Sequence, residues 1–435
     1  MERNAALTEK PAAARNSCRL CAPLGASLVF RGIAGAVPLL HGSQGCATYI
    51  RRYLIGHFRE PVDIASSSFG ESAAIFGGKD NLFCALNNII SQYRPSMIGI
   101  ATTCLSETIG DDVDGYLFDY SVINRKAPPI VHVSTPSYRG SHTDGFHGAV
   151  KAVISSLARP ALHKHHIALL GGMLSPADLR HLRAVLSAFD MKHILFPDYS
   201  DTLDGPSWDE YHTIPPGGTS PADIHRLGGV RAAIELGAMP NYRGGGGSVL
   251  RERFNVPVFE AGIPVGVKET DRFFSILERI AGRKTPEYYV KQRGRLIDSY
   301  VDGHKYVFGR RVAVIADEDL LVGLVSFLNE IAMVPVICAT GSGKTGRLKE
   351  ALQSVAPEQA AETVVVEEAD YETIQTHVTR LAPDCIVGNS KAYPLARALG
   401  VPLIRVGFPV HDRVGAQRLR HVGYEGTQAL FDRLV

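Results

Sequence analysis

The sequence of 435 residues contains no hydrophobic run long enough to cross a membrane, and its first residues, MERNAALTEKPAAARNS, lack the apolar core of a signal peptide. It also lacks an excess of charge of either sign, because 46 basic residues face 44 acidic ones and the formal net charge is +2. The first absence predicts a cytoplasmic protein with no membrane partner, and the second gives no electrostatic reason to expect nucleic acid as a partner. In a reducing compartment, the seven cysteines are expected to serve metal binding, catalysis or burial rather than a disulfide framework.

Short β-branched runs alternate along the whole chain with segments whose apolar residues recur at helical spacing. Strands are predicted at residues 97–103, 130–135, 166–172, 193–198, 312–317, 334–340, 363–368, 385–389 and 402–408. Because continuous apolar strands separated by helices form parallel sheets covered on both faces, the fold class is predicted to be α/β. The length fits two or three domains, and the alternation of strands and helices predicts three Rossmann-like ones, at about residues 17–155, 156–300 and 301–435.

Cysteines of the first predicted domain lie where turns lead into helices. Cys104 follows the predicted strand at 97–103, Cys46 ends the turn HGSQGC before an amphipathic pattern, and Cys21 precedes the apolar segment APLGASLVF. Ser137 comes just after the predicted strand at 130–135. Ligands of open parallel sheets bind beyond the carboxyl ends of the strands, and a helix N-terminus lowers the pKa of a thiol. Thiolate is the form that binds iron, so an iron–sulfur site is one interpretation of these residues.

Other interpretations of the cysteines remain open at this point. Cys18 and Cys21 form a Cys-x-x-Cys pair, which could be a redox dithiol, half of a zinc site, a source of cluster ligands or two unrelated thiols. The spacing of Cys21, Cys46 and Cys104 matches no ferredoxin or zinc-finger pattern, and free cysteines are often small buried hydrophobic residues. Three cysteines are also one fewer than a full cluster set, so Cys18, Ser137 or another chain would have to supply a further ligand.

Long motifs resemble the nitrogenase component 1 superfamily over nearly the whole chain, from about residue 18 to the end. They are CAPLGA, HGSQGCATY, HFREPV, ESAAIFGGKDN, IATTCLSETIGDD, STPSYRGSH, GRLIDSYVDGHKYVFGRR, IVGNS and PLIRVGFPVHDR. The resemblance is strongest to the β-type subunits, which include the nitrogenase β chain, the β-type chain of the cofactor-assembly scaffold, and nitrogenase-like reductases. It implies the superfamily's fold of three Rossmann-like domains, and a homologous α-type subunit as partner in an α2β2 assembly.

The resemblance also implies a cofactor. Positions that match Cys21, Cys46 and Cys104 hold a P-cluster-type [8Fe-7S] iron–sulfur cluster shared with the α-type subunit, and the thiolate that matches Cys46 bridges its two halves. The residue that matches Ser137 is an additional oxygen ligand, whereas Cys18 is expected to be an extra thiol without a metal. A larger iron–sulfur metallocofactor is expected in the partner subunit, which carries the Cys and His ligands for it.

Two further residues take roles from the resemblance. Phe76 matches an exposed aromatic residue at the docking surface for an ATP-dependent iron protein, which binds transiently; an ordinary core phenylalanine is the alternative. Tyr49 lies one helical turn beyond Cys46 and matches a residue between the cluster and the catalytic cofactor, although packing against the cluster fits its position equally well. His41 and His411 belong to no pair with ligand spacing and are expected to be structural.

The segment CATGSGKTGR looks like a phosphate-binding loop that ends at Gly343, Lys344 and Thr345. The glycine that such a loop requires five positions before Gly343 is replaced by Cys338. ATP is therefore expected to bind the separate iron protein and not this chain.

The complete set of ligand types favours an electron-relay subunit of an oxidoreductase over the assembly scaffold, whose β-type chains do not keep all three cysteines. The chain begins only twenty residues before Cys21, whereas many nitrogenase β chains carry a longer N-terminal arm. The predicted function is therefore that of a nitrogenase-like reductase, such as a methylthio-alkane reductase acting on a small organic sulfur compound. A nitrogenase β chain and the cofactor-assembly scaffold are the alternatives.

Overall fold

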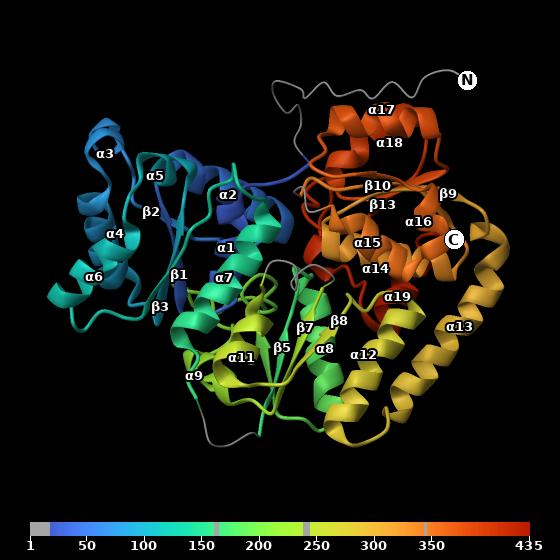
Figure 1. The fold of residues 1–435 in the computed structure, drawn as a ribbon, viewed down its shortest axis with the longest axis horizontal. Helices are drawn as coiled ribbons and strands as arrows, with labels where there is room; N and C mark the ends of the chain where they lie inside the picture. The colour runs from blue at the N-terminus through green and yellow to red at the C-terminus, as the bar shows by residue number, and fades with distance from the viewer. Residues whose placement is uncertain (1–17, 161–164, 238–243, 343–345) are drawn as a thin grey trace.

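The computed structural model describes residues 18–160, 165–237, 244–342 and 346–435. In this part of the chain the strands form three separate sheets, and every strand pairing within them is parallel (Figure 1). The predicted α/β fold class is thus confirmed. Lys344, which belongs to the segment that looks like a phosphate-binding loop, lies outside the described residues.

The first sheet has the strand order β2-β1-β3-β4 and lies at the left of Figure 1. Its strands are β1 (Ala36–His41), β2 (Ala65–Ser66), β3 (Met97–Thr102) and β4 (Ile130–Val133). The accompanying helices are α1 (Ala22–Arg31), α2 (Gln44–Phe58), α3 (Glu71–Phe76), α4 (Lys79–Tyr93), α5 (Cys104–Ile109), α6 (Val113–Ile123) and α7 (His142–Leu157). The chain first adds β2 on one side of β1 and then returns to add β3 on the other. The carboxyl ends of β1 and β3 therefore flank a topological switch point, where diverging connections leave a crevice.

The second sheet, with the order β6-β5-β7-β8, follows the same scheme. Its strands are β5 (Ile167–Leu170), β6 (His193–Phe196), β7 (Ala232–Leu236) and β8 (Val258–Ala261). The helices described between and after them are α8 (Pro176–Ala188), α9 (Pro221–Arg226), the 3₁₀ helix η1 (Leu227–Gly229), α11 (Gly246–Phe254), α12 (Gly266–Ala281) and α13 (Glu287–Val307).

The third sheet has the order β11-β10-β9-β12-β13 and lies at the upper right of Figure 1. Its strands are β9 (Arg311–Ile315), β10 (Val334–Ala339), β11 (Val364–Val366), β12 (Cys385–Gly388) and β13 (Leu403–Arg405). Its helices are α14 (Glu318–Glu330), α15 (Arg347–Val355), α16 (Pro357–Glu362), α17 (Tyr371–Leu381), η2 (Ser390–Ala392), α18 (Tyr393–Leu399), η3 (Ala416–Arg418) and α19 (Gly423–Phe431).

The predicted strands are all present, with ends that differ by a few residues, but β1, β2, β7 and β8 were not predicted. β1 contains Pro38, which seldom lies within a strand, and β2 pairs with β1 only at Leu39 and Leu40. β7 and β8 each carry a glutamate that interrupts the apolar run. In β7 this residue, Glu235, is buried and accepts a hydrogen bond of 3.1 Å from the backbone N–H of Gly247.

Helix α13 has 21 residues and runs along the edge of the molecule opposite the first sheet (Figure 1). The boundary predicted between residues 300 and 301 falls inside this helix. The division of the chain into three domains therefore stays a prediction, whereas the three sheets are observed. Of the helices in the described ranges, none combines the length and the apolar character that a membrane crossing needs.

Helices α1 and α7 cross with their backbones in close contact at two glycines. A Cβ atom built on Gly25 would lie 1.8 Å from the carbonyl oxygen of His142, and one built on Gly145 would lie 1.8 Å from that of Ala22. Such distances are far below van der Waals contact, so only glycine, which has no side chain, allows the crossing at both positions. The crossing fixes the start of α1, and with it Cys21, against the first sheet.

Gly25→Ala is expected to lower the free energy of unfolding by about 1–3 kcal/mol, because the added methyl group overlaps the backbone of α7. The measurement is the midpoint of thermal or urea unfolding. Gly294→Ala is the matched control: no atom lies within 4 Å of a Cβ built at this exposed position of α13, so the midpoint should stay or rise. Equal midpoints for Gly25→Ala and the wild type would contradict the close contact.

Candidate functional site

The three cysteines of the predicted site lie at the starts of three helices around the first sheet. Cys21 is the N-cap residue of α1, Cys46 lies in the first turn of α2, and Cys104 is the first residue of α5. α2 follows β1 and α5 follows β3, so Cys46 and Cys104 come after the two strands that flank the switch point. The sequence predicted that Cys46 ends the turn before the helix. In the structure α2 already begins at Gln44, so Cys46 lies inside the helix.

Ser137 lies between two of the elements that carry cysteines. Its backbone N–H donates a hydrogen bond of 3.3 Å to the Sγ of Cys104, and its hydroxyl oxygen accepts one of 3.2 Å from the backbone N–H of Ala22. Cys21, the neighbour of Ala22, pairs with Ser141 in an isolated antiparallel bridge. Backbone contacts thus bring the segment after β4 to both Cys104 and the start of α1.

The thiol of Cys46 is close enough to the other two thiols for their charges to act on it. Burial raises the pKa of Cys46, the neighbouring Cys21 and Cys104 raise it further, and a contact of 3.9 Å with the Ser43 hydroxyl lowers it. The sequence predicted a lowered pKa from the helix N-terminus. For Cys46 this prediction is wrong: its pKa is raised, because burial disfavours the charged thiolate. Cys21, Cys46, Cys104 and Ser137 are called the thiol cluster below.

The thiol cluster opens at the surface of the chain, where Cys104 is exposed and its other members are half-buried. Within the described ranges, no three His, Cys, Asp or Glu side chains are placed to hold one metal ion. Separate thiols beside a hydroxyl suit a multinuclear iron–sulfur cluster, which takes thiolate ligands from several cysteines, and soft sulfur ligands disfavour hard cations. The donor set therefore fits an iron–sulfur cluster.

Cys18 takes no part in the thiol cluster. It is buried in a core cluster with residues of the third sheet, including Ile315 and Ala339, and forms a side-chain hydrogen bond with Tyr371. Burial raises the pKa of Cys18 to about 12. Both cysteines of the Cys-x-x-Cys pair are free thiols, and only Cys21 lies with the other predicted ligands.

Tyr49 lies beside the thiol cluster on the open side of α2. Its side chain is 43% exposed and its ring centroid lies 4.8 Å from that of Tyr53. Burial raises the pKa of Tyr49, and the neighbouring Tyr53 and the charge of Cys21 raise it further. Tyr49 lies away from the buried face of α2, which consists of Ala47, Ile50, Leu54, His57 and Phe58. Its position toward a cofactor in a partner subunit stays a prediction.

Phe76 ends the short helix α3 and is 85% exposed, so the alternative of a core phenylalanine is wrong. Ile75 beside it is 73% exposed and was missed by the sequence reasoning, although the adjacent apolar pair in AAIFGG was a signal. Large apolar side chains that gather at the surface mark sites of protein contact. Ile75 and Phe76 are called the apolar tip below.

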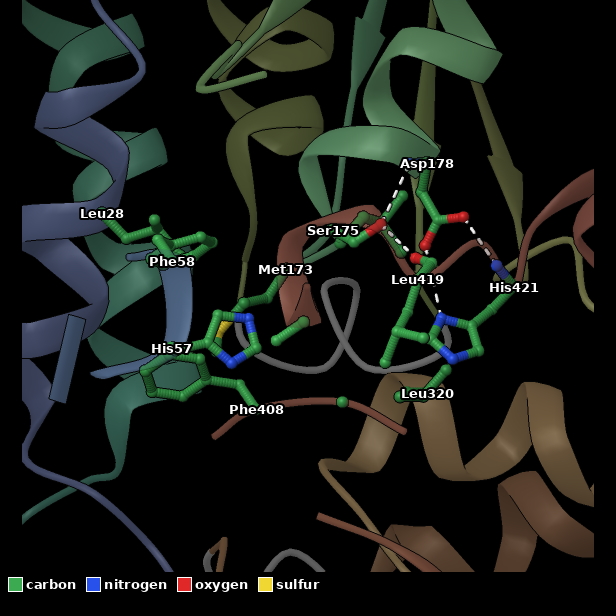
Figure 2. Close-up of a pocket in the computed structure, with 13 residues that line it drawn as sticks. Leu28, His57, Phe58, Met173, Ser175, Asp178, Leu320, Phe408, Leu419 and His421 are labelled. Carbon is green, nitrogen blue, oxygen red and sulfur yellow. Dashed lines mark hydrogen bonds and ion pairs between the residues drawn. The ribbon is translucent and has the colours of Figure 1, made fainter. Parts of the chain in front are cut away.

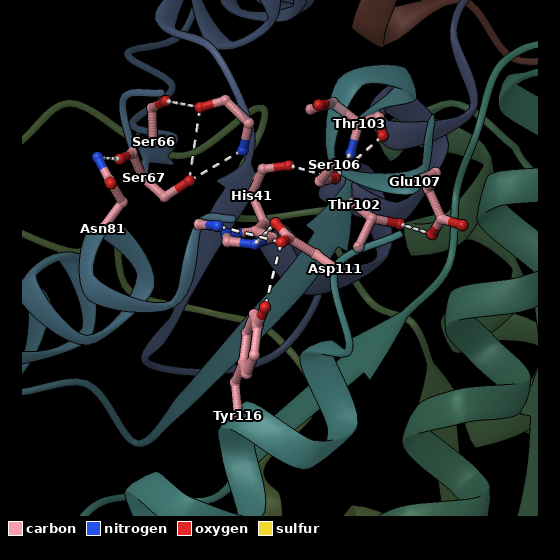
Figure 3. A network of polar contacts seen from close by, with 12 residues as sticks. His41, Ser66, Ser67, Asn81, Thr102, Thr103, Ser106, Glu107, Asp111 and Tyr116 are labelled. Atoms are coloured by element: carbon pink, nitrogen blue, oxygen red, sulfur yellow. Dashed lines mark hydrogen bonds and ion pairs between the residues drawn. The ribbon is translucent and has the colours of Figure 1, made fainter. Parts of the chain in front are cut away.

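His41 is fully buried at the carboxyl end of β1, and its Nε2 lies 3.0 Å from Oδ2 of Asp111 (Figure 3). Burial lowers the pKa of His41, and the nearby Asp111 only partly offsets this effect, so the ring is neutral. The sequence reasoning singled out His41 but missed its partner Asp111, which lies seventy positions away. His411 has its Nδ1 3.3 Å from the hydroxyl of Ser390.

A pocket lies between α1, α2, α8 and the segment from residue 407 to 421 (Figure 2). Its lining includes His57, whose pKa is lowered to about 3 by burial. It also includes His421, whose Nδ1 lies 3.5 Å from Oδ2 of Asp178. The space open to a water-sized molecule is about 30 Å³, which is room for about one water. This pocket is too small to hold a substrate.

The sequence matches the model of the nitrogenase component 1 type oxidoreductase family over residues 21–435. It is 37% identical over 426 residues to the nitrogenase molybdenum-iron protein beta chain of Methanothermobacter thermautotrophicus, covering 95% of this chain and 92% of that one. The corresponding beta chain of Clostridium pasteurianum is 33% identical, with 98% and 94% covered. The nitrogenase iron-molybdenum cofactor biosynthesis protein NifN of Nostoc is 31% identical, with 93% and 88% covered.

A solved structure of nitrogenase Cp1 at pH 6.5 has a TM-score of 0.94 to this chain at 33% sequence identity. The similarity covers 98% of this chain and 93% of that one. The chain therefore belongs to the nitrogenase component 1 type oxidoreductase family and is a β-type subunit of that family.

Proposed function

We propose that this β-type subunit relays electrons in a nitrogenase-like reductase, that it shares a P-cluster-type iron–sulfur cluster with an α-type subunit, and that an ATP-dependent iron protein supplies the electrons. The observation that carries the proposal is the thiol cluster at the switch point of the first sheet. When bound, the iron–sulfur cluster would accept electrons and pass them on. The chain's own residues present the sulfur ligands on an open surface that a second subunit can cover.

Each member of the thiol cluster has a distinct proposed role. Cys46 would hold both halves of the cluster. Cys21 and Cys104, which lie near enough for their charges to act on Cys46, would each supply a further thiolate. Ser137 is the additional oxygen ligand, and its contacts to Cys104 and to the start of α1 support this role.

The reaction itself is proposed to take place on a larger iron–sulfur metallocofactor in the α-type subunit. A small organic sulfur compound is the proposed substrate, as for a methylthio-alkane reductase. Dinitrogen is the second candidate, favoured by the identity to nitrogenase beta chains over nearly the whole chain. The identity to NifN supports a third candidate, an assembly scaffold. Assays of the purified complex for thiol release from a methylthio-alkane and for ammonia from dinitrogen separate these candidates, because a scaffold yields neither product.

Cys46→Ala is expected to remove most of the iron of the relay cluster, because one thiolate is lost from both halves. The measurement is the iron content and the reduced-state electron paramagnetic resonance spectrum of the purified complex with the α-type subunit. Cys84→Ser is the matched control, since Cys84 is exposed on α4 and lies outside the thiol cluster. Unchanged iron and spectra in Cys46→Ala would refute the proposed cluster.

The apolar tip is the proposed docking surface for the iron protein. Its support is the exposure of Phe76 and Ile75 at the end of a short helix on the same sheet that carries the thiol cluster. An exposed aromatic side chain gains contact area on docking at little cost in conformational entropy, which is why such residues often dominate protein interfaces.

Phe76→Ala is expected to raise the KM for the iron protein by about tenfold, because an aromatic anchor is typically worth more than 1 kcal/mol. The measurement is the steady-state rate of the holo-complex against the concentration of iron protein, at saturating ATP. Tyr211→Ala is the control, since Tyr211 is 80% exposed in the segment between β6 and α9 and lies outside the apolar tip. If Phe76→Ala and Tyr211→Ala change the KM equally, or if neither changes it, the iron protein does not dock at the apolar tip.

A stripe of exposed apolar residues on α13 supports association of two copies of this chain in an α2β2 assembly. Val290, Ile297 and Val301 are 53%, 37% and 72% exposed, and their spacing of seven and four residues places them on one face of the helix. Phe308, just past the helix end, extends the stripe and is 64% exposed. The helix lies on the side of the molecule away from the apolar tip, so both surfaces can be covered at once (Figure 1).

Val301→Glu is expected to convert most of the α2β2 assembly into αβ pairs, because a carboxylate in an apolar interface has no partner. The measurement is the mass by light scattering or analytical ultracentrifugation. Arg295→Glu introduces the same side chain on another side of the same helix and should leave the mass unchanged. A normal mass for Val301→Glu would exclude this face from the assembly.

A further inference from the structure

The apolar tip and the thiol cluster are joined by a buried polar network that the proposed function leaves without a role (Figure 3). Asp111 lies at its centre, directly after Gly110, the C-cap of α5. Its carboxylate contacts groups from three elements: Nε2 of His41 at 3.0 Å, the backbone N–H of Gly78 at 3.0 Å, and the hydroxyl of Tyr116 at 3.3 Å. The side chains of Asp111 and His41 are 2% and 0% exposed, so water does not replace these contacts.

On one side the network ends at the apolar tip. Gly78 comes two residues after Phe76, and the intervening Gly77 adopts a φ of +93°, a conformation that side chains rarely allow. A Cβ atom built on Gly78 would lie 2.1 Å from the ring of Phe69 and 2.8 Å from the carboxylate of Asp111. The turn behind the apolar tip is therefore packed directly against the carboxylate and cannot move without it.

On the other side the network ends at the thiols. The carbonyl oxygen of His41 accepts hydrogen bonds from the backbone N–H of Thr103 at 3.1 Å and from the hydroxyl of Ser106 at 2.9 Å. These contacts fix the first turn of α5, which begins with Cys104. His41 also ends β1, five residues before Cys46, so one residue adjoins both segments that carry these thiols.

We propose that Asp111 and His41 are positioning residues that hold the apolar tip in a fixed relation to Cys46 and Cys104, so that a reductase seated on the tip is aligned with the sulfur ligands. The inference rests on the proposed function. Asp111 binds the tip and His41 through different oxygens of one carboxylate, and His41 binds the start of α5 through its backbone. A displacement of the tip on docking would therefore reach the thiol cluster through three successive contacts.

The test uses the holo-complex of this chain with its α-type subunit and compares two routes of reduction. Asp111→Ala removes all three contacts, and His41→Phe keeps a buried ring but removes the contact to the carboxylate. Tyr116→Phe is the matched control. It also removes a contact to the carboxylate of Asp111, but this contact does not lie between the tip and the thiols. For each variant we would measure the iron content, the rate of cluster reduction by dithionite, and the rate of electron transfer from the iron protein with ATP.

Asp111→Ala and His41→Phe should keep the iron content and the dithionite rate but slow transfer from the iron protein by about tenfold, within the range of couplings carried by such networks. Tyr116→Phe should match the wild type, and Asp111→Asn, which keeps an acceptor for Gly78, should recover most of the rate. An unchanged transfer rate in both Asp111→Ala and His41→Phe would overturn the inference. Loss of the iron or of the folded complex would also overturn it, because a positioning role leaves the cluster in place. If the wild-type complex lacks the iron, or if Phe76→Ala has no effect, the proposed function fails instead.

Discussion

The crevice between the carboxyl ends of β1 and β3 is the constraint on which the candidate site depends. At this point the connections leave the sheet in opposite directions, so the two strand ends are not covered by a further strand. The carbonyl oxygen of His41 is instead satisfied by Thr103 and Ser106 of the neighbouring connection. The same hydrogen bonds place the starts of α2 and α5 side by side, and with them Cys46 and Cys104.

Cys21 reaches the site by a separate route, through helix packing rather than sheet topology. The α1–α7 crossing is possible because Gly25 and Gly145 let the two backbones touch. The segment after β4 then closes the arrangement, since Ser137 contacts both Cys104 and the start of α1. Residues from four connections thus meet, and each is held mainly by backbone groups. A site held in this way has little freedom to rearrange, as a ligand set for a rigid cofactor requires.

Three separate surfaces of the chain are proposed to bind partners. The thiol cluster is open at the surface, where Cys104 is exposed. The apolar tip stands on α3 at one end of the molecule, and the stripe on α13 lies at the other (Figure 1). Because exposed apolar surface is costly in water, the apolar tip and the stripe on α13 are most stable when covered. Partners at separate surfaces do not compete, so an α-type subunit, a second copy and a docking protein can bind together.

The sequence by itself determined the α/β class, because apolar runs and helical periods are local patterns that can be recognised without knowledge of the fold. It also determined which residue types the candidate site offers, since Cys21, Cys46, Cys104 and Ser137 lie in motifs at the ends of strands and starts of helices. β1 and β7 escaped prediction because Pro38 and Glu235 break the local pattern, and only pairing and a buried hydrogen bond make these residues acceptable in strands.

The tertiary structure decided everything that depends on distant contacts. It separated Cys18 from Cys21, three positions apart, because one lies in the core beside the third sheet and the other faces the first. It raised the pKa of Cys46, where a helix start alone predicted the reverse, because burial disfavours the charged thiolate. It also paired His41 with Asp111. Burial and pairing arise only when segments far apart in the chain meet, and no local pattern of residues contains that information.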